Sequence, residues 1–248
     1  SARLDALVIG SDERADLAVL AAQLGPGSFT TSAEARERCA RDETEDLRFL
    51  PAAVALPIST SEVQTILRFA HDHRIPVTPR GAGTGLSGGA LPVCGGIVLS
   101  LERMNRVREI DRRNLVAVAE AGVVTADLQR AVEEVGLFYP PDPSSRESCQ
   151  LGGNIAEDAA GPRSAKYGTT RRYVLGLEAV LADGSLLATG GKNRKDATGY
   201  NLTQLLVGSE GTLAVVTAAT LRLLAKPAAT LTMILPFPAL EAAAAAVE

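Results

Sequence analysis

Tryptophan is absent from this chain of 248 residues, and aromatic residues make up only 4% of it, although hydrophobic residues make up 46%. A buried core must therefore be built mainly from alanine, valine, leucine and isoleucine. The sequence also lacks any run of about eighteen apolar residues, the length that a transmembrane helix requires. Its N-terminus shows no basic stretch followed by an apolar one, as a signal peptide would. We therefore expect no integral membrane segment.

Cysteine and positive charge are also scarce. The three cysteines, Cys39, Cys94 and Cys149, lie far apart and lack the spacing of metal ligands. We expect free thiols, no metal site and a reducing, cytoplasmic environment. A net charge of −4 argues against nucleic acid or an anionic membrane surface as the main partner. Any attachment to a membrane would then have to come through a partner protein.

Glycine, in contrast, is concentrated in the segment 79–89, whose sequence is PRGAGTGLSGG. Glycine permits positive φ angles and close approach of the backbone, so such a loop can direct several N–H groups at one anion. A diphosphate is the anion that fits best, which predicts a nucleotide cofactor. The alternative interpretation is a flexible surface turn.

The obvious dinucleotide pattern does not explain this loop. Gly83, Gly85 and Gly88 match G-x-G-x-x-G, but that pattern works only when a helix begins within it. Pro92 and two further glycines follow, and they prevent a helix from continuing. The loop is not a P-loop either, because no Gly-Lys-Ser/Thr ends it. We expect a helix-free backbone nest, and an NAD-dependent Rossmann enzyme is the least favoured interpretation.

Helices and strands alternate in the first part of the chain. The pattern predicts helices over 12–24 and 32–44, a helix behind a capping box at Ser59–Glu62, and strands over 52–56, 75–78, 96–101 and 107–111. The stretch from 52 to 78 would form a β-α-β unit that delivers the glycine loop at its end.

The second part begins with a strand over 115–121 and a helix that Thr125 caps and Gly136 ends. A hairpin of 173–182 and 185–189 with the two-residue turn Asp183-Gly184, and a long strand over 212–224, are expected later. The segments 230–237 and 239–247 resemble a strand and an alanine-rich helix. They are either a frayed end or the start of a further domain.

The long segment 140–170 has little strand signal, and loops of that length inside a domain are usually functional. Its sequence PPDPSS predicts a rigid extended stretch with hydroxyls and one carboxylate. Gln150–Ala156 predicts a glycine turn that enters a short helix, where N–H groups and the Asn154 amide could bind phosphate or a heterocycle. Ser209–Thr212 is another small-residue turn. Each is more often an ordinary turn, but together with the loop 79–89 they favour a cofactor site.

These motifs resemble the FAD-binding domain of the p-cresol methylhydroxylase and vanillyl-alcohol oxidase superfamily, and within it glycolate oxidase flavoprotein subunits and D-lactate dehydrogenases. The resembling segments, in order, are PRGAGTGLSGG (79–89), PPDPSS (140–145), LGGNIAEDAAGPRSAKYG (151–168) and GKNRKDATGYNLTQLLVGSEGTLAVVT (191–217). The resemblance implies an α+β, non-Rossmann fold in which FAD lies between a small β-α-β subdomain and a larger mixed sheet flanked by helices. It divides the chain into an N-terminal helical segment (1–49), two FAD-binding subdomains (50–111 and 112–226) and the start of a C-terminal cap domain (227–248).

The resemblance also implies which residues hold the cofactor. The pyrophosphate would be held by Arg80, Gly81, Ala82, Gly83, Thr84, Gly85, Gly88 and Gly89. The flavin and ribityl region would be lined by Asp142, Ser145, Gly152, Gly153, Asn154 and Ala156, with Gly161, Tyr167 and Gly168 in the same wall. Gly211 and Val216 would contact the flavin or adenine end through their backbone.

We expect the FAD to be non-covalent. Relatives with covalent flavin use a histidine or cysteine beside these loops, and the loop 79–89 has neither. His71 and His73 lie near the end of a predicted helix, where they would cap its dipole. Cys149 is the nearest thiol and is expected to be unlinked.

The chain departs from the family at three positions, because the family usually has Thr at Gln150, Asn at Asp158 and Gly at Ala160. A carboxylate at Asp158 that faced the phosphates would repel them by about 1–4 kcal/mol and weaken FAD binding. It would have no such effect if it pointed to solvent.

The sequence offers no catalytic base. In resembling dehydrogenases the substrate pocket and the histidine base come from the cap domain, and no histidine follows His73 here. We expect the FAD-binding portion of an oxidoreductase that moves a hydride from a small 2-hydroxy acid, such as glycolate or D-lactate, to FAD, with this portion inactive alone. A separate electron acceptor or an iron–sulfur subunit would take the electrons. The alternative is a non-catalytic flavin-carrying or structural subunit of a larger complex.

Overall fold

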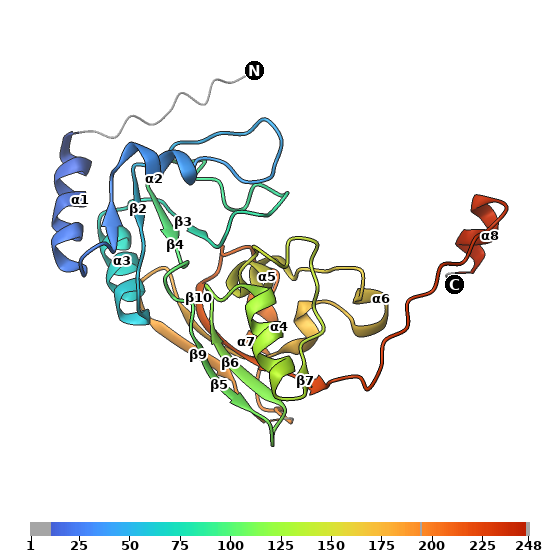
Figure 1. The fold of residues 1–248 in the computed structure, drawn as a ribbon. Coiled ribbons are helices and arrows are strands. Elements are labelled where there is room, and N and C mark those ends of the chain that lie inside the picture. The colour runs from blue at the N-terminus through green and yellow to red at the C-terminus, as the bar shows by residue number, and fades with distance from the viewer. Residues whose placement is uncertain (1–10, 194, 247–248) are drawn as a thin grey trace.

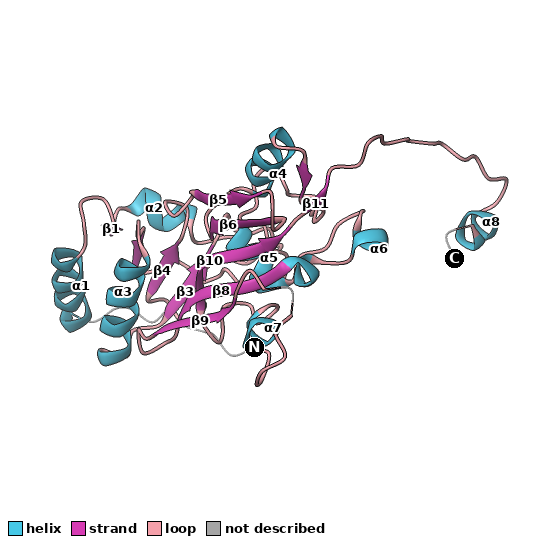
Figure 2. Ribbon diagram, turned by 90° about the horizontal axis from the view of Figure 1, so that it is seen from below, coloured by secondary structure: helices cyan, strands magenta, loops and turns pink. Residues whose placement is uncertain are grey.

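The computed structural model describes residues 11–193 and 195–246. It is a mixed α+β protein in which two main sheets lie side by side with helices around them (Figures 1 and 2). The α+β class expected from the sequence is therefore confirmed.

The first sheet comes from the N-terminal part of the chain. The elements of this part are α1 (Ser11–Gln23), β1 (Phe29–Thr30), α2 (Ala33–Arg38), β2 (Ala53–Ala55), α3 (Thr60–Asp72), β3 (Val77–Arg80) and β4 (Ile97–Ser100). The strand order is β1-β2-β4-β3, in which β2, β4 and β3 are parallel and β1 is antiparallel to β2. Since β3 ends at Arg80, the β2-α3-β3 unit delivers the glycine loop as predicted.

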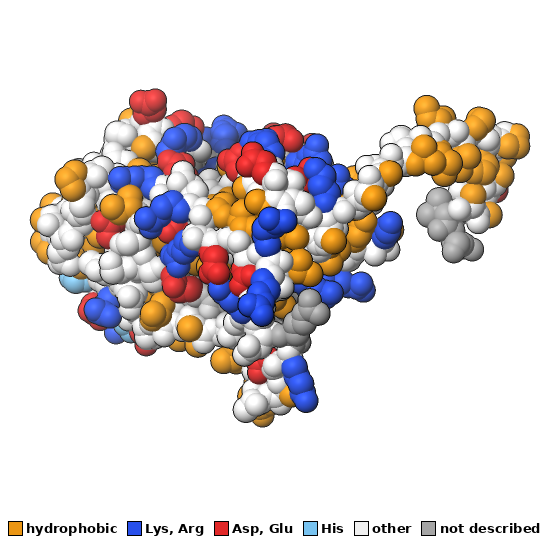
Figure 3. All heavy atoms as spheres, turned by 60° about the horizontal axis from the view of Figure 1, so that its bottom comes forward, with side chains coloured by type: hydrophobic (Ala, Val, Ile, Leu, Met, Phe, Trp, Pro, Cys, Tyr) orange, Lys and Arg blue, Asp and Glu red, His pale blue; other side chains and the backbone are white. Residues whose placement is uncertain are grey.

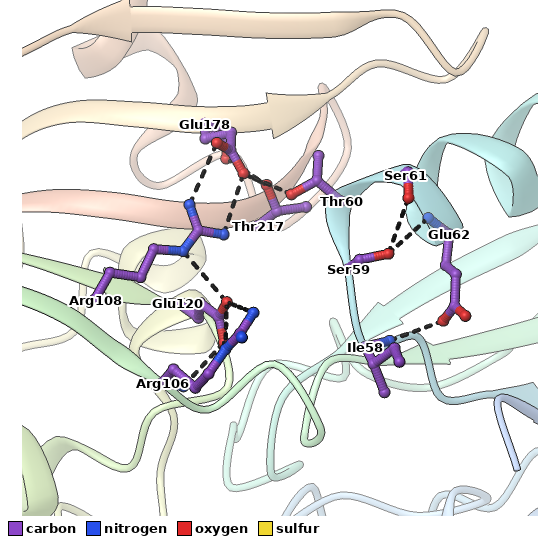
Figure 4. A network of polar contacts seen from close by, with 10 residues as sticks. All are labelled: Ile58, Ser59, Thr60, Ser61, Glu62, Arg106, Arg108, Glu120, Glu178 and Thr217. Atoms are coloured by element: carbon purple, nitrogen blue, oxygen red, sulfur yellow. Dashed lines mark hydrogen bonds and ion pairs between the residues drawn. The ribbon is translucent and has the colours of Figure 1, made fainter. Parts of the chain in front are cut away.

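Local sequence signals explain both ends of α3. At its start, the Ser59 hydroxyl accepts the Glu62 N–H at 3.2 Å, while the Glu62 carboxylate accepts the N–H of Ile58 at 2.9 Å (Figure 4). The predicted capping box therefore forms with its return bond displaced by one residue. At its end, the N–H groups of Arg74 and Ile75 turn back to carbonyls of the helix. This turn explains why β3 begins at Val77 and not at the predicted residue 75.

The second sheet comes from the remainder of the chain. The elements of this part are β5 (Val107–Asp111), β6 (Val116–Glu120), α4 (Thr125–Glu134), β7 (Leu137–Phe138), α5 (Leu151–Glu157), α6 (Ser164–Tyr167), η1 (Thr170–Tyr173), β8 (Val174–Val180), β9 (Leu186–Gly190), α7 (Leu202–Leu206), β10 (Val215–Arg222) and β11 (Leu224–Ala225). Its strands lie in the order β5-β6-β10-β8-β9 and are all antiparallel. Leu128 of α4 and Ile155 of α5 are fully buried in one core with Leu177 of β8, so these helices cover one face of this sheet.

Two turn predictions in this part are wrong in detail. Thr125 is the first residue of α4 and makes no capping bond, because its hydroxyl accepts the Asn154 side-chain N–H at 2.5 Å. The β8–β9 turn has three residues and not two, since the Leu181 N–H bonds the Ser185 carbonyl at 2.9 Å. Gly184, with a φ of 79°, supplies the left-handed residue that such a turn requires.

Apolar packing and one polar network join the two sheets. Val63 and Ile66 of α3 lie in the same core as Val180 of β8 and Val215 of β10. Beside this core, the Glu178 carboxylate accepts hydroxyl hydrogen bonds from Thr60, at the start of α3, and from Thr217 of β10, at 2.5 and 3.0 Å (Figure 4).

The network continues along the second sheet through arginines. Glu120 is only 1% exposed, and its carboxylate accepts hydrogen bonds from the guanidinium groups of Arg106 and Arg108. Arg108 also forms an ion pair with Glu178 at 3.4 Å. A buried carboxylate needs such partners, since an unpaired buried charge is strongly destabilising.

The last described segment contradicts one prediction. Residues 230–237 form no strand, and Ile234 among them is 92% exposed. A strand requires a neighbour with which to pair, and this segment extends away from the body, ending in the short helix α8 (Leu240–Ala245) (Figures 1 and 2). Figure 3 shows hydrophobic side chains along this extension. The final residue of the helix predicted over 239–247 lies outside the described residues. No described helix is long and apolar enough to cross a membrane.

Candidate functional site

A cleft with a volume of about 300 Å³ opens where the loop after β3, the start of α5 and the turn before β10 meet. Leu101, after β4, and Ala121, after β6, close it from below. The cleft therefore lies at the junction of the two sheets, where loops from both converge. Three glycine-rich segments that are far apart in the sequence become neighbours there.

Most residues predicted to hold a cofactor line this cleft. They are Arg80, Gly81, Ala82, Gly83, Thr84, Gly85, Gly89, Ser145, Gly152, Gly153, Asn154, Ala156, Gly211 and Val216. Gly88, Asp142, Gly161, Tyr167 and Gly168 do not line it. The structure thus brings the glycine turns together, and contact with a cofactor stays a prediction for all of these residues.

Asp142, Gly161 and Tyr167, which lie outside the cleft, make contacts within the segment 140–173. The buried Asp142 carboxylate accepts the Arg163 N–H at 3.1 Å and pairs with the Arg163 side chain. A side chain at Gly161 would collide with the Asp142 carbonyl, and the Tyr167 carbonyl accepts the Tyr173 hydroxyl at 2.8 Å. These residues shape the segment 140–170 from within.

Arg80 organises the glycine loop from beneath. Its side chain is 9% exposed, and its guanidinium donates to the carbonyls of Arg41 at 2.8 Å and Ala90 at 3.3 Å. A Cβ at Gly83 would collide with this guanidinium, so the loop can wrap it only because glycine stands there. No carboxylate among the described residues forms an ion pair with Arg80, so its positive charge is available to an anion in the cleft.

The start of α5 offers fewer donors than its sequence suggests. The N–H groups of Leu151 and Gly152 already bond the carbonyls of Val123 and Ala121, at 2.9 and 2.7 Å. The Asn154 amide donates one N–H to Thr125, and its binding of phosphate or a heterocycle stays a prediction. Within the described chain, the Gly153 N–H has no partner.

The two neighbouring glycines of α5 differ in their surroundings. A Cβ at Gly152 would lie 2.8 Å from the Ala121 Cβ, which is too close. A Cβ at Gly153 would meet nothing within 4 Å, and the φ of this residue is not in the left-handed region. The fold therefore explains the glycine at 152 but gives no reason for the one at 153, which leaves space for a ligand against the backbone.

Gln150 presents an unsatisfied acceptor at the same place. The residue is 8% exposed, and its Oε1 is buried without a hydrogen-bond partner in the described structure. This oxygen lies 3.5 Å from where a Gly81 Cβ would stand. Buried acceptors without partners are rare, and they are frequently found where a ligand belongs.

Sequence reasoning missed two acidic residues of the cleft, Glu157 and Glu210. The Glu157 carboxylate accepts the Ser87 hydroxyl at 3.2 Å and has no arginine or lysine partner among the described ion pairs. Burial raises the pKa of Glu157, and the charges of Glu210 and Asp42 raise it further, against the lowering effect of Ser87. Glu210 stands within the predicted turn Ser209–Thr212 and Glu157 directly follows the predicted segment Gln150–Ala156, but nothing in the sequence indicates that they meet.

Asp158 does not face the cleft. It ends α5 with a φ of 50°, and its carboxylate accepts the N–H of Arg171 at 2.8 Å and the Arg171 Nε at 2.9 Å. Its carboxylate is turned to Arg171, so the structure gives no basis for the repulsion that a phosphate-facing carboxylate would cause.

No histidine lines the cleft. The His73 ring stacks on Phe69 with 3.9 Å between centroids and bonds the Phe69 carbonyl at the end of α3, as the capping interpretation predicted. Cys149 lines the cleft as a buried free thiol beside the Thr125 hydroxyl, and Cys39 and Cys94 are also free. The described residues contain no group of histidine, cysteine and acidic side chains that could hold a metal ion.

Comparison with known protein families matches residues 51–190, more than half of the chain, to the model described as "FAD binding domain". The chain belongs to the FAD binding domain family. The matched range contains the glycine loop and the start of α5, which form two of the three sides of the cleft.

Relatives within this family agree with the resemblance seen in the sequence. The chain is 48% identical over 220 residues to the glycolate oxidase subunit GlcD of Bacillus subtilis (strain 168), covering 89% of this chain and 47% of that protein. It is 50% identical over 204 residues to a D-lactate dehydrogenase of Archaeoglobus fulgidus, covering 81% of this chain and 46% of that protein. The chain thus spans about half the length of these relatives.

A solved structure of an alkyldihydroxyacetonephosphate synthase has a similar fold, with a TM-score of 0.77 and 26% identity. The match covers 87% of this chain and 44% of that one. The FAD binding domain and the FAD-linked relatives identify FAD as the cofactor of this family member.

Proposed function

We propose that this chain is the FAD-holding part of an oxidoreductase that oxidises a small 2-hydroxy acid of the glycolate or D-lactate type. The observation that carries the proposal is the single cleft formed by the loop after β3, the start of α5 and the turn before β10. The names of the relatives, glycolate oxidase subunit and D-lactate dehydrogenase, support the substrate class. When bound, the flavin supplies the acceptor for a hydride from the hydroxyl-bearing carbon.

The proposal includes the division of the chain into two FAD-binding subdomains at 50–111 and 112–226, after an N-terminal segment at 1–49. The two sheets support a division into two parts, but their strand sets do not coincide with these bounds, because β5 (Val107–Asp111) pairs in the second sheet and β1 (Phe29–Thr30) in the first. The segment 227–248 would begin a cap domain, which is consistent with its exposed hydrophobic side chains.

The groups that line the cleft suit the diphosphate of FAD. Arg80 supplies an uncompensated positive charge beneath the loop 81–89, and Gly153 leaves open space beside a free N–H group. Charge-assisted hydrogen bonds to phosphate are among the stronger polar contacts in proteins. Because about 300 Å³ is at the small end of ligand sites, we propose that the rest of the cofactor extends past the cleft. Asp142, Gly161, Tyr167 and Gly168 would then support that part from the segment 140–170.

The side chains of the cleft support non-covalent binding of FAD. They also support a reaction that needs groups from outside this chain. No imidazole is present in the cleft, and the Cys149 thiol is buried against Thr125. No imidazole is available there as the base that removes the substrate's hydroxyl proton, and the carboxylates of Glu157 and Glu210 lie beside Gly89 of the glycine loop proposed to hold the diphosphate. We propose that this base, and a separate electron acceptor or iron–sulfur subunit, lie outside these 248 residues.

The first experiment measures FAD binding by the purified chain, through quenching of flavin fluorescence during a titration. Gly153→Val should weaken FAD binding by about tenfold or more, because its side chain would occupy the open space of the cleft. Ala131→Val adds the same side chain to α4 away from the cleft and should leave FAD binding unchanged. Equal FAD affinity in both variants would show that the cofactor does not approach Gly153.

A second experiment tests the reaction. The chain replaces the matching region of the Bacillus subtilis glycolate oxidase subunit GlcD, and the chimera is examined by visible absorption without oxygen. Addition of glycolate should bleach the flavin bands. A chimera that holds FAD but is bleached by no 2-hydroxy acid would instead favour a non-catalytic flavin-carrying subunit.

A further inference from the structure

A second cavity, with a volume of about 640 Å³, lies on the other side of the turn before β10. Its walls come from the end of α3, from β3, from the β8–β9 hairpin and from the segment 211–215. Cavities that bind small organic molecules have volumes of about 300–1,000 Å³, so the size fits such a ligand.

The walls of this cavity combine apolar side chains with basic ones. Leu67, Val77 and Val180 contribute apolar surface, while His71 and Arg74 are the only ionisable side chains that line the cavity. No described carboxylate forms an ion pair with Arg74. The nearby Asp183 carboxylate does not line the cavity and already accepts the N–H and hydroxyl of Ser185. A cavity that combines apolar and polar surface, and whose ionisable lining side chains among the described residues are basic, suits a ligand that has an apolar body and one negative charge.

The backbone of Arg74 is a second, independent observation. Arg74 follows the last turn of α3 with a φ of 55°, its N–H bonds the His71 carbonyl at 3.2 Å, and the Ile75 N–H bonds the Ala70 carbonyl at 2.8 Å. This is the Schellman arrangement, in which glycine is strongly favoured at the left-handed position. An arginine there costs free energy that glycine would save. Such strain is tolerated most often where the side chain has a task.

The second cavity also adjoins the first cleft. Pro79, Gly211, Ala214 and Val215 line both, so they form a partition between the two. A ligand in the second cavity would contact the reverse side of a wall of the cofactor cleft.

We propose that the second cavity binds a small organic anion with an apolar body, whose carboxylate pairs with Arg74. His71 lines the same cavity. The apolar body lies against the α3, β3 and β8 side chains. This site shares the partition residues, Gly211 among them, with the proposed FAD cleft, but the proposal rests on Arg74 and does not depend on bound FAD.

The test is a calorimetric titration of the purified chain with octanoate, and with octylammonium as a probe of the same apolar body and opposite charge. Octanoate should bind with one site per chain, and octylammonium should not bind. Arg74→Gly should weaken octanoate binding by about tenfold, the value of one charge-assisted contact. This variant should not unfold the chain, because glycine is favoured at a φ of 55°.

Two further variants complete the design. Arg68→Ala removes an arginine from the same helix outside the cavity and should leave octanoate binding unchanged, whereas Ala182→Trp should fill the cavity and abolish binding. Absence of octanoate binding, or equal binding by the native chain and Arg74→Gly, overturns the proposal. Because octanoate binding is measured without FAD, this failure is separable from a failure of the proposed function.

Discussion

The carboxylates of the network around Glu120 and Glu178 and the carboxylates that line the cleft have opposite surroundings. Burial raises the pKa of Glu120, but hydrogen bonds from Arg106 and Arg108 outweigh it and hold that pKa below its usual value. Burial also raises the pKa of Glu157 in the cleft. The charges that act on Glu157 are the like charges of Glu210 and Asp42, so its pKa stays high. Both regions contain acidic residues that are removed from water, but only the network around Glu120 and Glu178 pairs them with arginine side chains.

This difference separates what holds the fold from what awaits a ligand. The network of Glu120 and Glu178 satisfies each carboxylate with arginine or hydroxyl donors, so its charge stabilises the junction of the sheets. The cleft instead contains an unpaired arginine, an unsatisfied Gln150 oxygen and two carboxylates without cations. Unsatisfied and strained groups gather where a protein binds something, because stability alone would remove them.

The largest effect should come from breaking the ion pairs of Glu120 along the second sheet. Glu120→Ala removes a carboxylate that is 1% exposed and leaves two arginines without their common partner. We expect a loss of about 2–4 kcal/mol in the free energy of unfolding, reduced from the value for fully buried pairs because Arg106 is exposed. Chemical denaturation measures it. Glu147→Ala, which removes an exposed carboxylate, is the control. If it lowered the free energy of unfolding as much as Glu120→Ala, the network around Glu120 would stabilise the fold no more than an exposed carboxylate does.

The neighbouring glycines of α5 sharpen the comparison within one helix. Gly152→Ala places a Cβ 2.8 Å from the Ala121 Cβ, and we expect it to lower the free energy of unfolding by about 1–3 kcal/mol through overpacking. Gly153→Ala meets open space and should raise it by about 0.5–1 kcal/mol, because alanine is the better helix former. Thermal unfolding of both variants, without FAD, gives the signs. Destabilisation by both substitutions would show that Gly153 also serves the fold.

The pH dependence of stability should carry opposite contributions from the two regions. The lowered pKa values of Glu120 and Glu178 give stability that is present above their unfolded value of 4.5 and is lost as the pH falls through their folded values. The raised pKa of Glu157 gives stability that is present below 4.5 and is lost as the pH rises through its folded value.

Glu157→Gln isolates the second contribution. This variant should lose the decline in unfolding free energy that begins as the pH rises above 4.5, while the loss at acid pH remains. Denaturation at a series of pH values, compared with the native chain, measures the difference. Identical profiles would mean that Glu157 has the same pKa in the folded and unfolded chain.

The sequence predicted the features that depend on neighbours in the chain. The Ser59 cap, the β-α-β unit and the glycine loop after β3 all follow from local spacing, and each is present. Thr230–Phe237 has the composition of a strand but no partner, and pairing partners cannot be seen in local sequence. The cleft shows the same limit, since Glu157 and Glu210 become neighbours only through the packing of α5 against the turn before β10.

Asp158 provides the smallest and most specific test, because it lies next to Glu157 in sequence but belongs with the partnered carboxylates. Its carboxylate bonds the backbone and side chain of Arg171, whose guanidinium also donates to the carbonyls of Gln204 and Val207. Asp158→Asn keeps a residue that tolerates the φ of 50° and removes one partly exposed ion pair, so we expect a loss below about 1 kcal/mol in the free energy of unfolding.

The same substitution introduces the residue that the family resemblance implies at this position, so its effect on the cofactor is informative. If Asp158 repelled the phosphates, Asp158→Asn would tighten FAD binding; because the carboxylate is turned to Arg171, we expect the dissociation constant of FAD to remain unchanged. Glu157→Gln is the matched comparison, since it removes a charge that does line the cleft and should tighten FAD binding at neutral pH. Flavin fluorescence titrations of both variants decide between them. If only Asp158→Asn tightened FAD binding, Asp158 and not Glu157 would be the carboxylate that repels the cofactor. Asp158 would then belong with the carboxylates of the cleft and Glu157 with the partnered ones.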